Sequence, residues 1–387
     1  MSRSPLPGGN RPLDELKPTL PREFYVDADH HRRELEVFWY SRWICVGRTE
    51  GLTDSGQYQC VSIGDQEILV VRNTGGTLKG FHNTCRHRGS ILCEAKKGRF
   101  NDGRIVCPYH AWTYTLDGAL THTPWRIPST DFDFRDHMLH QVSVGEWAGF
   151  LFLHLDPNPS ETLTEYLGEL PALFSNWKLE TSVSGDRMHK VIDCNWKIFW
   201  ENFSECYHCP GIHPELSRIV PRFQKGILRA SDEPGWTAQS GPDPDTDTRL
   251  APGMVTWSDD GLTQLPDFPD LSAAERSLGQ TFGTLLPSCF IAGHIDFVRF
   301  GHVLPLGPEQ TLVTVECLFP SETLEDTSND ISKTTEFIRR LTEQDFRVCE
   351  LNQRGLHCRR HDTGVLVPQE YYTHNFQNFV REGLGCE

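Results

Sequence analysis

The chain contains 387 residues, of which 37% are hydrophobic and 23% charged, a composition typical of globular proteins and unlike disordered or collagen-like chains. Its formal net charge of -16 argues against a nucleic-acid-binding protein that relies on bulk positive charge. The longest strongly apolar stretch, around residues 148–155, is too short to span a membrane, and the polar, proline-rich start lacks the core of a signal peptide. Thirteen irregularly spaced cysteines indicate a reducing compartment. We therefore expect a cytoplasmic protein with one large or two ordinary domains.

The first part of the chain predicts an arm and a small β domain. Residues 1–26 are expected to be loosely structured, and the apolar residues after Asp27 fall on one helical face, so the arm and helix end at residue 43. Between residues 44 and 158, short β-rich runs alternate with glycine-containing turns. This pattern predicts a small antiparallel domain.

The second part, residues 159–387, predicts a larger domain that mixes helices and strands. Helices are expected over 162–174 and 195–209, and a strand over 188–194, with Pro210 and Gly211 ending the second helix. Two strong strand runs at 295–306 and 310–319 precede a long helix over 329–356. The segment 222–280 is rich in Pro, Gly, Asp and Ser, which predicts an irregular lid.

Two short motifs in the β domain each contain one cysteine and one histidine. Cys85 and His87 form the first, and Cys107 and His110 form the second after an interval of 19 residues. Two thiolates and two imidazoles are the ligands of a Rieske [2Fe–2S] cluster, in which the imidazoles raise the reduction potential. A zinc site is the alternative, although zinc motifs usually pair cysteine with cysteine and histidine with histidine. The other eleven cysteines are expected to be reduced thiols.

The segment around these motifs is positively charged. Residues 86–104 contain six basic and two acidic side chains, a local charge of +4 in a chain of -16. Such a rim could steer an acidic redox partner, or it could contact a neighbouring subunit.

A second group of metal-binding residues lies in the larger domain. Glu205 and His208 are three residues apart and would share a helix face, whereas His213 approaches His208 only if the helix breaks between them. Two histidines and one carboxylate with open positions form the facial triad of non-haem Fe(II) oxygenases. The spacing alone leaves the identity of the carboxylate open, and two ordinary histidines at a helix end are the alternative.

The segments CRHRGS and CPYHAWTYTLDG, together with the histidine pair, resemble the α subunits of Rieske non-haem iron oxygenases. The resemblance implies an α+β fold, in which an antiparallel β Rieske domain precedes a helix-grip (START-like) catalytic domain with an antiparallel sheet and a long C-terminal helix. It implies that the first two motifs hold the cluster, and that His208 and His213 bind a mononuclear Fe(II). Asp345, in TEQDFRVCELNQRGL, would be the third ligand, in preference to Glu343 and Glu350.

The resemblance also implies an assembly and an electron source. In an α3 homotrimer, His110 of one chain would hydrogen-bond Glu205 of the next, which in turn holds His208. Arene dioxygenases usually have aspartate at the position of Glu205, and their preceding asparagine is one residue further away than Asn202 is here. This catalytic junction of Glu205 and Asn202 therefore departs from the arene pattern. Electrons would come from NAD(P)H through a separate flavin and iron–sulfur reductase.

The signature ENFSECYHCPGIHPEL resembles the branch of the family that acts on quaternary ammonium compounds. It implies O2-dependent N-demethylation of a substrate of the glycine betaine or proline betaine type, with release of formaldehyde. Aromatic rings attract such cations by about 0.5–2 kcal/mol each. Candidate rings, for each of which core packing is the alternative, are Phe203, Tyr207, Trp257, Phe297 and Phe300.

Three other functions remain open from the residues. An oxygenase with a different pocket would hydroxylate an aromatic ring or O-demethylate an aryl ether. A Rieske protein without a mononuclear iron would be a non-catalytic electron carrier. If the two Cys–His motifs held zinc, the protein would be a structural zinc protein.

Overall fold

The computed structural model describes residues 11–125, 127, 129–229, 232–233 and 250–386. The chain divides into two compact units, which we call the β unit, Leu35–Tyr166, and the α+β unit, which contains the chain up to Glu34 and Leu167–Glu387. These boundaries differ from the expected ones at 43/44 and 158/159, because the N-terminal segment packs with the larger unit. Within the described ranges, no helix has the length and apolar character needed to cross a membrane.

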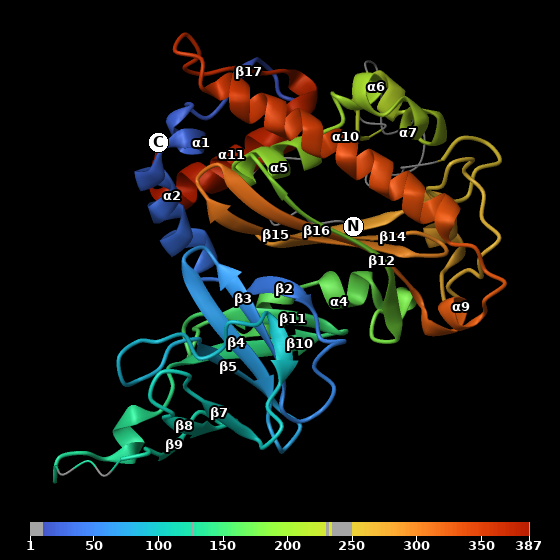
Figure 1. Ribbon diagram of the computed structural model, residues 1–387. Coiled ribbons are helices and arrows are strands. Elements are labelled where there is room, and N and C mark those ends of the chain that lie inside the picture. Colours follow the sequence, from blue (N-terminus) through green and yellow to red (C-terminus); the bar gives the residue numbers. More distant parts are fainter. Residues whose placement is uncertain (1–10, 126, 128, 230–231, 234–249, 387) are drawn as a thin grey trace. The chain divides into compact units, whose positions relative to one another are not determined.

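The β unit contains a seven-stranded antiparallel sheet and a three-stranded sheet (Figure 1). The strand order of the large sheet is β2-β11-β10-β5-β4-β3-β6, and that of the small sheet is β7-β8-β9. The strands of the large sheet are β2 (Ile44–Arg48), β3 (Gln57–Ile63), β4 (Gln66–Arg72), β5 (Leu78–His82), β6 (Lys97–Arg99), β10 (Gln141–Trp147) and β11 (Phe150–His154). Those of the small sheet are β7 (Arg104–Val106), β8 (Thr113–Thr115) and β9 (Leu120–His122).

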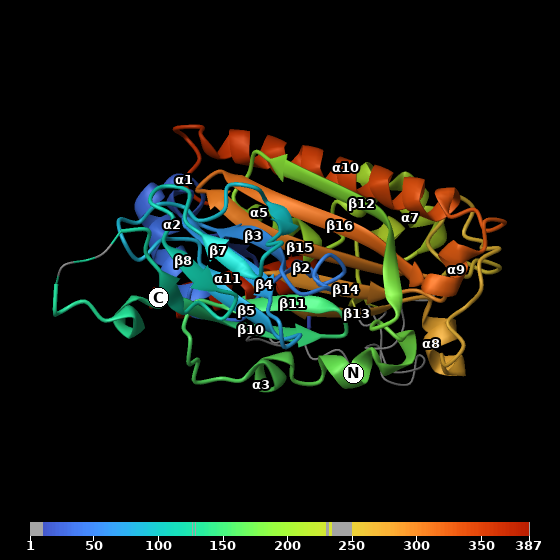
Figure 2. The ribbon, with the colours of Figure 1, turned by 60° about the horizontal axis from the view of Figure 1, so that its bottom comes forward.

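The α+β unit is built on a five-stranded antiparallel sheet in the order β12-β16-β15-β14-β13. The long helix α10 runs along one face of this sheet, over β12 and β16 (Figures 1 and 2). The strands are β12 (Ser182–Ile192), β13 (Thr281–Leu285), β14 (Cys289–Gly293), β15 (Val298–Gly307) and β16 (Gln310–Pro320). The helices that matter below are α2 (Ala28–Glu34), α5 (Trp196–Phe203), α6 (Cys209–Ile212), α7 (Pro214–Ile219), α10 (Ser332–Leu356) and α11 (Tyr371–Leu384).

The expected α+β class, the paired strands and the long helix are confirmed. The expected lid, 222–280, includes residues 230–231 and 234–249, which lie outside the described part of the chain. Its described remainder contains a short helix, α8 (Ala273–Leu278), which begins with a capping box between Ser272 and Glu275. Helix α11 was not expected from the sequence.

A buried ion pair joins the N-terminal segment to the larger unit. Lys197, in the first turn of α5, lies 2.6 Å from Glu34 at the end of α2, and both side chains are fully buried. Trp196 Nε1 donates to the same carboxylate at 2.8 Å, and the Asn195 side chain accepts from Lys197 Nζ at 2.8 Å. The Asn195 side chain also caps α5 by accepting the backbone N–H of Lys197 at 3.0 Å, so the satisfied ion pair lies at the start of this helix.

Replacing one partner of this pair should destabilise the protein strongly. Glu34→Gln leaves the Lys197 ammonium buried without a counter-charge, so the free energy of unfolding should fall by about 3–5 kcal/mol in urea titrations followed by circular dichroism. The double variant E34Q/K197M, which removes both charges, should regain part of that loss. The exposed pair Asp29–Arg32 on the same helix is the control, and D29N should cost less than about 1 kcal/mol. Similar small losses for E34Q and D29N would contradict the buried-pair interpretation.

Candidate metal centres

Two histidines and one aspartate converge in the α+β unit, where the starts of α6 and α7 face the middle of α10. His213 Nε2 lies 2.7 Å and His208 Nε2 3.4 Å from Asp345 Oδ1. The three possible ligand atoms lie within 4.8 Å of one another. The structure thus brings Asp345 to a histidine pair more than 130 residues earlier in the sequence, and Glu343 and Glu350 are not part of the group.

A turn, and not a continuous helix, places the first histidine. The expectation that one helix extends over 195–209 is wrong, because α5 ends at Phe203, where the Ser204 hydroxyl donates to Trp200 O at 2.6 Å. The Glu205 carboxylate then accepts the backbone N–H of His208 at 3.2 Å and also that of Tyr207. Helix α6 starts afresh with Pro210 in its first turn, where proline is favoured. Proline therefore begins the second helix and does not break the first.

Both imidazoles present the same ring nitrogen to Asp345. His208 Nδ1 lies 2.6 Å from Glu205 Oε1, and His213 Nδ1 lies 2.6 Å from Gln344 Oε1. When Nδ1–H donates to such an oxygen, Nε2 keeps its lone pair and can bind a metal. Gln344 is itself held, because its amide donates to Glu215 Oε1 at 2.8 Å.

Gln344 and Glu215 were not predicted as site residues. Gln344 precedes Asp345 on α10, and neither its residue type nor its spacing marks it as a partner of His213. Asn202, which was predicted, places its amide 3.5 Å from His208 Nε2.

The electrostatics of this group favour a bound cation. Burial lowers the pKa of His208, but Asp345 and Glu205 outweigh it and raise that pKa to about 10. Burial also raises the pKa of Asp345, but hydrogen bonds from His208 and His213 lower that pKa to about 2. The Asp345 carboxylate therefore remains ionised at neutral pH and stabilises positive charge beside it, which favours the binding of a divalent cation.

The four cysteine and histidine residues of the β unit also come together. Cys85 and His87 follow β5, and Cys107 and His110 lie between β7 and β8. The imidazole centroids of His87 and His110 are 4.7 Å apart. The two thiols are neighbours, since Cys107 contributes, after burial, to the raised pKa of Cys85. His110 Nδ1 is buried and has no hydrogen-bond partner within the described residues, as a metal-binding nitrogen would be.

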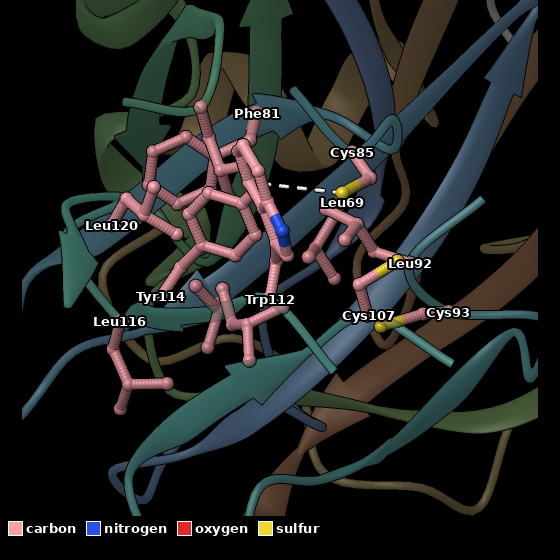
Figure 3. Close-up of a cluster of buried hydrophobic side chains, with 13 residues drawn as sticks. Leu69, Phe81, Cys85, Leu92, Cys93, Cys107, Trp112, Tyr114, Leu116 and Leu120 are labelled. Atoms are coloured by element: carbon pink, nitrogen blue, oxygen red, sulfur yellow. Dashed lines mark hydrogen bonds between the residues drawn. The ribbon is translucent and has the colours of Figure 1, made fainter. Parts of the chain in front are cut away.

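A buried hydrophobic cluster that includes Phe81, Trp112 and Tyr114 supports these loops (Figure 3). Tyr114 places its hydroxyl 3.2 Å from Cys85 Sγ, and Trp112 stacks on His87 with centroids 4.7 Å apart. Ala111, which directly follows His110, adopts a positive φ of 54°, which is uncommon for a residue with a Cβ. Hydrogen bonding to the sulfur and a dry surface are the features that tune a cluster.

Positive charge surrounds the loops of this second group. Five of the six basic residues between 86 and 104 are exposed, and Arg86 is half-buried. Arg86 donates to Met138 O, Arg99 pairs with Asp54, and Arg88 lies over the exposed ring of Tyr109.

One expectation about the cysteines is wrong. Cys206 and Cys209 form a disulfide with a Cα–Cα distance of 4.9 Å, so they are not reduced thiols. The turn between α5 and α6 brings them together, because Cys209 N donates to Cys206 O at 3.1 Å. The remaining eleven cysteines, including Cys85 and Cys107, are free.

The five candidate aromatic residues do not form one box. Phe203 and Trp257 both flank the guanidinium of Arg299. Tyr207 is largely exposed, whereas Phe297 and Phe300 are fully buried. Phe300 follows Arg299 on β15 and so points to the opposite face of the sheet.

A cavity of about 550 Å³ opens beside Glu205 and His208 within the α+β unit. Two further carboxylates line it, Glu201 and Glu370. Burial raises the pKa of Glu201 to about 7, although Tyr25 and Gln377 donate hydrogen bonds to it at 2.6 and 3.0 Å. The cavity is therefore acidic and adjoins the carboxylate that holds His208.

Comparison with known proteins gives two family matches along the chain. Residues 174–385 match the ring hydroxylating alpha subunit (catalytic domain), and residues 42–132 match the Rieske [2Fe-2S] domain. The chain is 33% identical to the glycine betaine monooxygenase oxygenase subunit of Chromohalobacter salexigens, over 92% of this chain and 85% of that protein. It is 26% identical to the chloroplastic choline monooxygenase of Beta vulgaris, over 96% of this chain and 78% of that protein.

The fold is also found in a solved structure of the quaternary ammonium Rieske monooxygenase CntA with gamma-butyrobetaine. The TM-score is 0.71, with 22% sequence identity over 95% of this chain and 96% of that chain.

Proposed function

Because the chain belongs to the Rieske non-haem iron oxygenases, as an α subunit with a Rieske [2Fe–2S] domain and a ring-hydroxylating catalytic domain, we propose that it N-demethylates a quaternary ammonium compound. It would act as the terminal component of a monooxygenase that uses O2 and NAD(P)H and releases formaldehyde. The convergence of His208, His213 and Asp345 carries the oxygenase part of this proposal. The glycine betaine monooxygenase relative supports the substrate class.

The residues of the two groups fit the two cofactors that this family requires. Cys85 and Cys107 would hold one iron of the Rieske cluster, and His87 and His110 the other. His208, His213 and Asp345 would hold the mononuclear Fe(II) on one face and leave positions open. When bound, this iron supplies the site where O2 is activated for attack on a C–H bond of an N-methyl group.

Neighbouring polar residues hold the two histidine ligands in position. Glu205 and Gln344 fix the orientation of the two imidazoles, and Glu215 fixes Gln344. Such partners raise the basicity of a ligand and set its tautomer. The oxygenated methyl group would then leave as formaldehyde, and the nitrogen would retain the remaining substituents as a tertiary amine.

The assembly we propose is an α3 homotrimer served by a separate flavin and iron–sulfur reductase. His110 of one chain would hydrogen-bond Glu205 of its neighbour, so that electrons reach His208 from the adjacent cluster. The acidic cavity beside Glu205 supports this docking, as do the exposed Tyr109 and basic side chains near His110. The same basic side chains suit an acidic reductase. We also propose a cytoplasmic location, which the eleven free cysteines support.

A substrate panel tests the proposed activity. With a reductase and NADH, formaldehyde should appear from glycine betaine, proline betaine or carnitine. An aryl methyl ether and an aromatic hydrocarbon should give no product. Turnover of the aromatic compounds alone would replace N-demethylation by ring hydroxylation or O-demethylation, and no turnover with any compound would favour an electron carrier.

Removing the proposed carboxylate ligand should empty one metal centre only. Asp345→Ala should lower the iron content from about three to about two atoms per chain, while the Rieske absorption spectrum remains. Glu343→Ala, two positions earlier on α10 and exposed, is the matched control and should keep about three irons per chain. Full iron occupancy in D345A would point to Glu205 as the third ligand.

Glu205→Gln should separate electron transfer from metal binding. The amide still contacts His208 but carries no charge, so both centres should remain loaded while oxidation of the pre-reduced cluster slows by about 10–100-fold. Rapid-mixing absorption spectroscopy with substrate and O2 measures that step. Glu370→Gln, which removes a carboxylate from the same cavity, is the control. In this variant the pre-reduced cluster should be oxidised at the normal rate. A normal rate in E205Q would exclude the proposed bridge.

A further inference from the structure

Arg299 is a cation without an anionic partner in the part of the chain that the structure describes. It lies on β15, opposite Ala292 of β14 and Cys317 of β16, and is half-buried. Its Nε is buried and finds no acceptor among the described residues. Burial lowers the pKa of Arg299 to about 10 and Asp345 opposes that shift, so the guanidinium is charged at neutral pH. A charge removed from water without a partner is costly.

Aromatic rings surround this guanidinium. Its Cζ lies 5.0 Å from the centroid of Trp257, 5.4 Å from Phe290 and 5.9 Å from Phe203. These cation–π contacts orient the side chain and offset part of its desolvation. They also mean that the rings expected to receive a substrate cation already contact a cation of the protein.

A second buried donor lies in the same group. Trp257 is 4% exposed, and its Nε1 finds no acceptor among the described residues. An indole N–H and a guanidinium can only donate, so the missing partner is an acceptor. A carboxylate satisfies both donors, carries the opposite charge and matches the planar fork of arginine.

The iron site lies close to this group. Phe203, whose ring centroid lies 5.9 Å from Arg299 Cζ, is the last residue of the helix that leads into the Glu205–His208 turn, and the charge of Asp345 raises the pKa of Arg299 against the effect of burial. A molecule that spans the two would therefore meet negative charge at the iron ligands and positive charge at Arg299.

We propose that Arg299, with Trp257 beside it, binds the carboxylate of a zwitterionic substrate and so directs its quaternary ammonium group toward the iron site. This inference rests on the proposed function and narrows it. The substrate class becomes quaternary ammonium compounds that carry a carboxylate, such as the betaines. Compounds with a hydroxyl in that place, such as choline, lack the group that Arg299 recognises.

The test compares two ligands that differ only in charge, glycine betaine and its carboxamide, in the iron-loaded protein. Calorimetry gives the Kd of each, and formaldehyde release gives KM and kcat. In Arg299→Gln, Kd and KM for the betaine should rise by about 10–100-fold, while those for the carboxamide change by less than about threefold. Arg299→Lys keeps the charge but loses the fork, so its effect should lie between those of wild type and R299Q.

The controls separate a binding role from a structural one. Arg354→Gln makes the same change at an exposed position of α10 and should leave both ligands unaffected. Iron content and circular dichroism establish that each variant is folded and loaded, and R299K decides the question if R299Q does not fold. Equal losses for betaine and carboxamide, or no loss for either, would overturn this inference and leave the proposed function intact. A wild type that demethylates no quaternary ammonium compound would overturn both.

Discussion

The buried pair of Glu34 and Lys197 is the constraint on which the α+β unit depends. It sets the start of α5, and the short length of that helix then places everything at its other end. Asn202 and Phe203 occupy the last turn, and the Glu205–His208 turn follows directly. A charge pair more than one helix length away thereby determines where an iron ligand lies. Hydrogen bonds from Trp196 to Glu34 and from Lys197 to Asn195 offset part of the desolvation free energy of the pair.

Negative and positive side chains lie close to each other around the candidate iron site. Asp345 and Glu205 flank the two imidazoles, and the carboxyl groups of Glu201 and Glu370, whose pKa values are raised by burial, line the adjoining cavity. Arg299 stands among aromatic rings with no described carboxylate bonded to it. The unit therefore has a built-in dipole along its candidate substrate site. A dipolar ligand would be bound in one orientation, and a simple cation would be held at one end only.

Much of this could be predicted from the sequence, because ligand chemistry restricts residue types. The Cys–His motifs, His208 and His213 were found in that way, and the strand patterns indicated the sheet. Residues whose role depends only on their position in the folded chain could not be predicted from the sequence. Gln344 acts through its position beside Asp345, and Arg299 is one polar residue in a strand that alternates between two faces. At the end of α5 the Ser204 hydroxyl and the Glu205 carboxylate bond to the backbone, and the pattern of apolar residues does not reveal such bonds. The irregular spacing of the cysteines along the chain did not predict the disulfide, because the local turn between Cys206 and Cys209 brings the two together.

The division of the α+β unit into two separate stretches of chain has a consequence for how the protein folds. Glu34 and Lys197 are 163 residues apart, and the whole β unit is synthesised between them. During translation, Glu34 of α2 cannot pair until Lys197 has been synthesised. The β unit is continuous in sequence and can fold before that. Closing so long a loop is slow compared with local helix formation. The N-terminal segment can thus pair with the larger unit only after Lys197 has been synthesised, and truncating it would remove the counter-charge of a buried lysine.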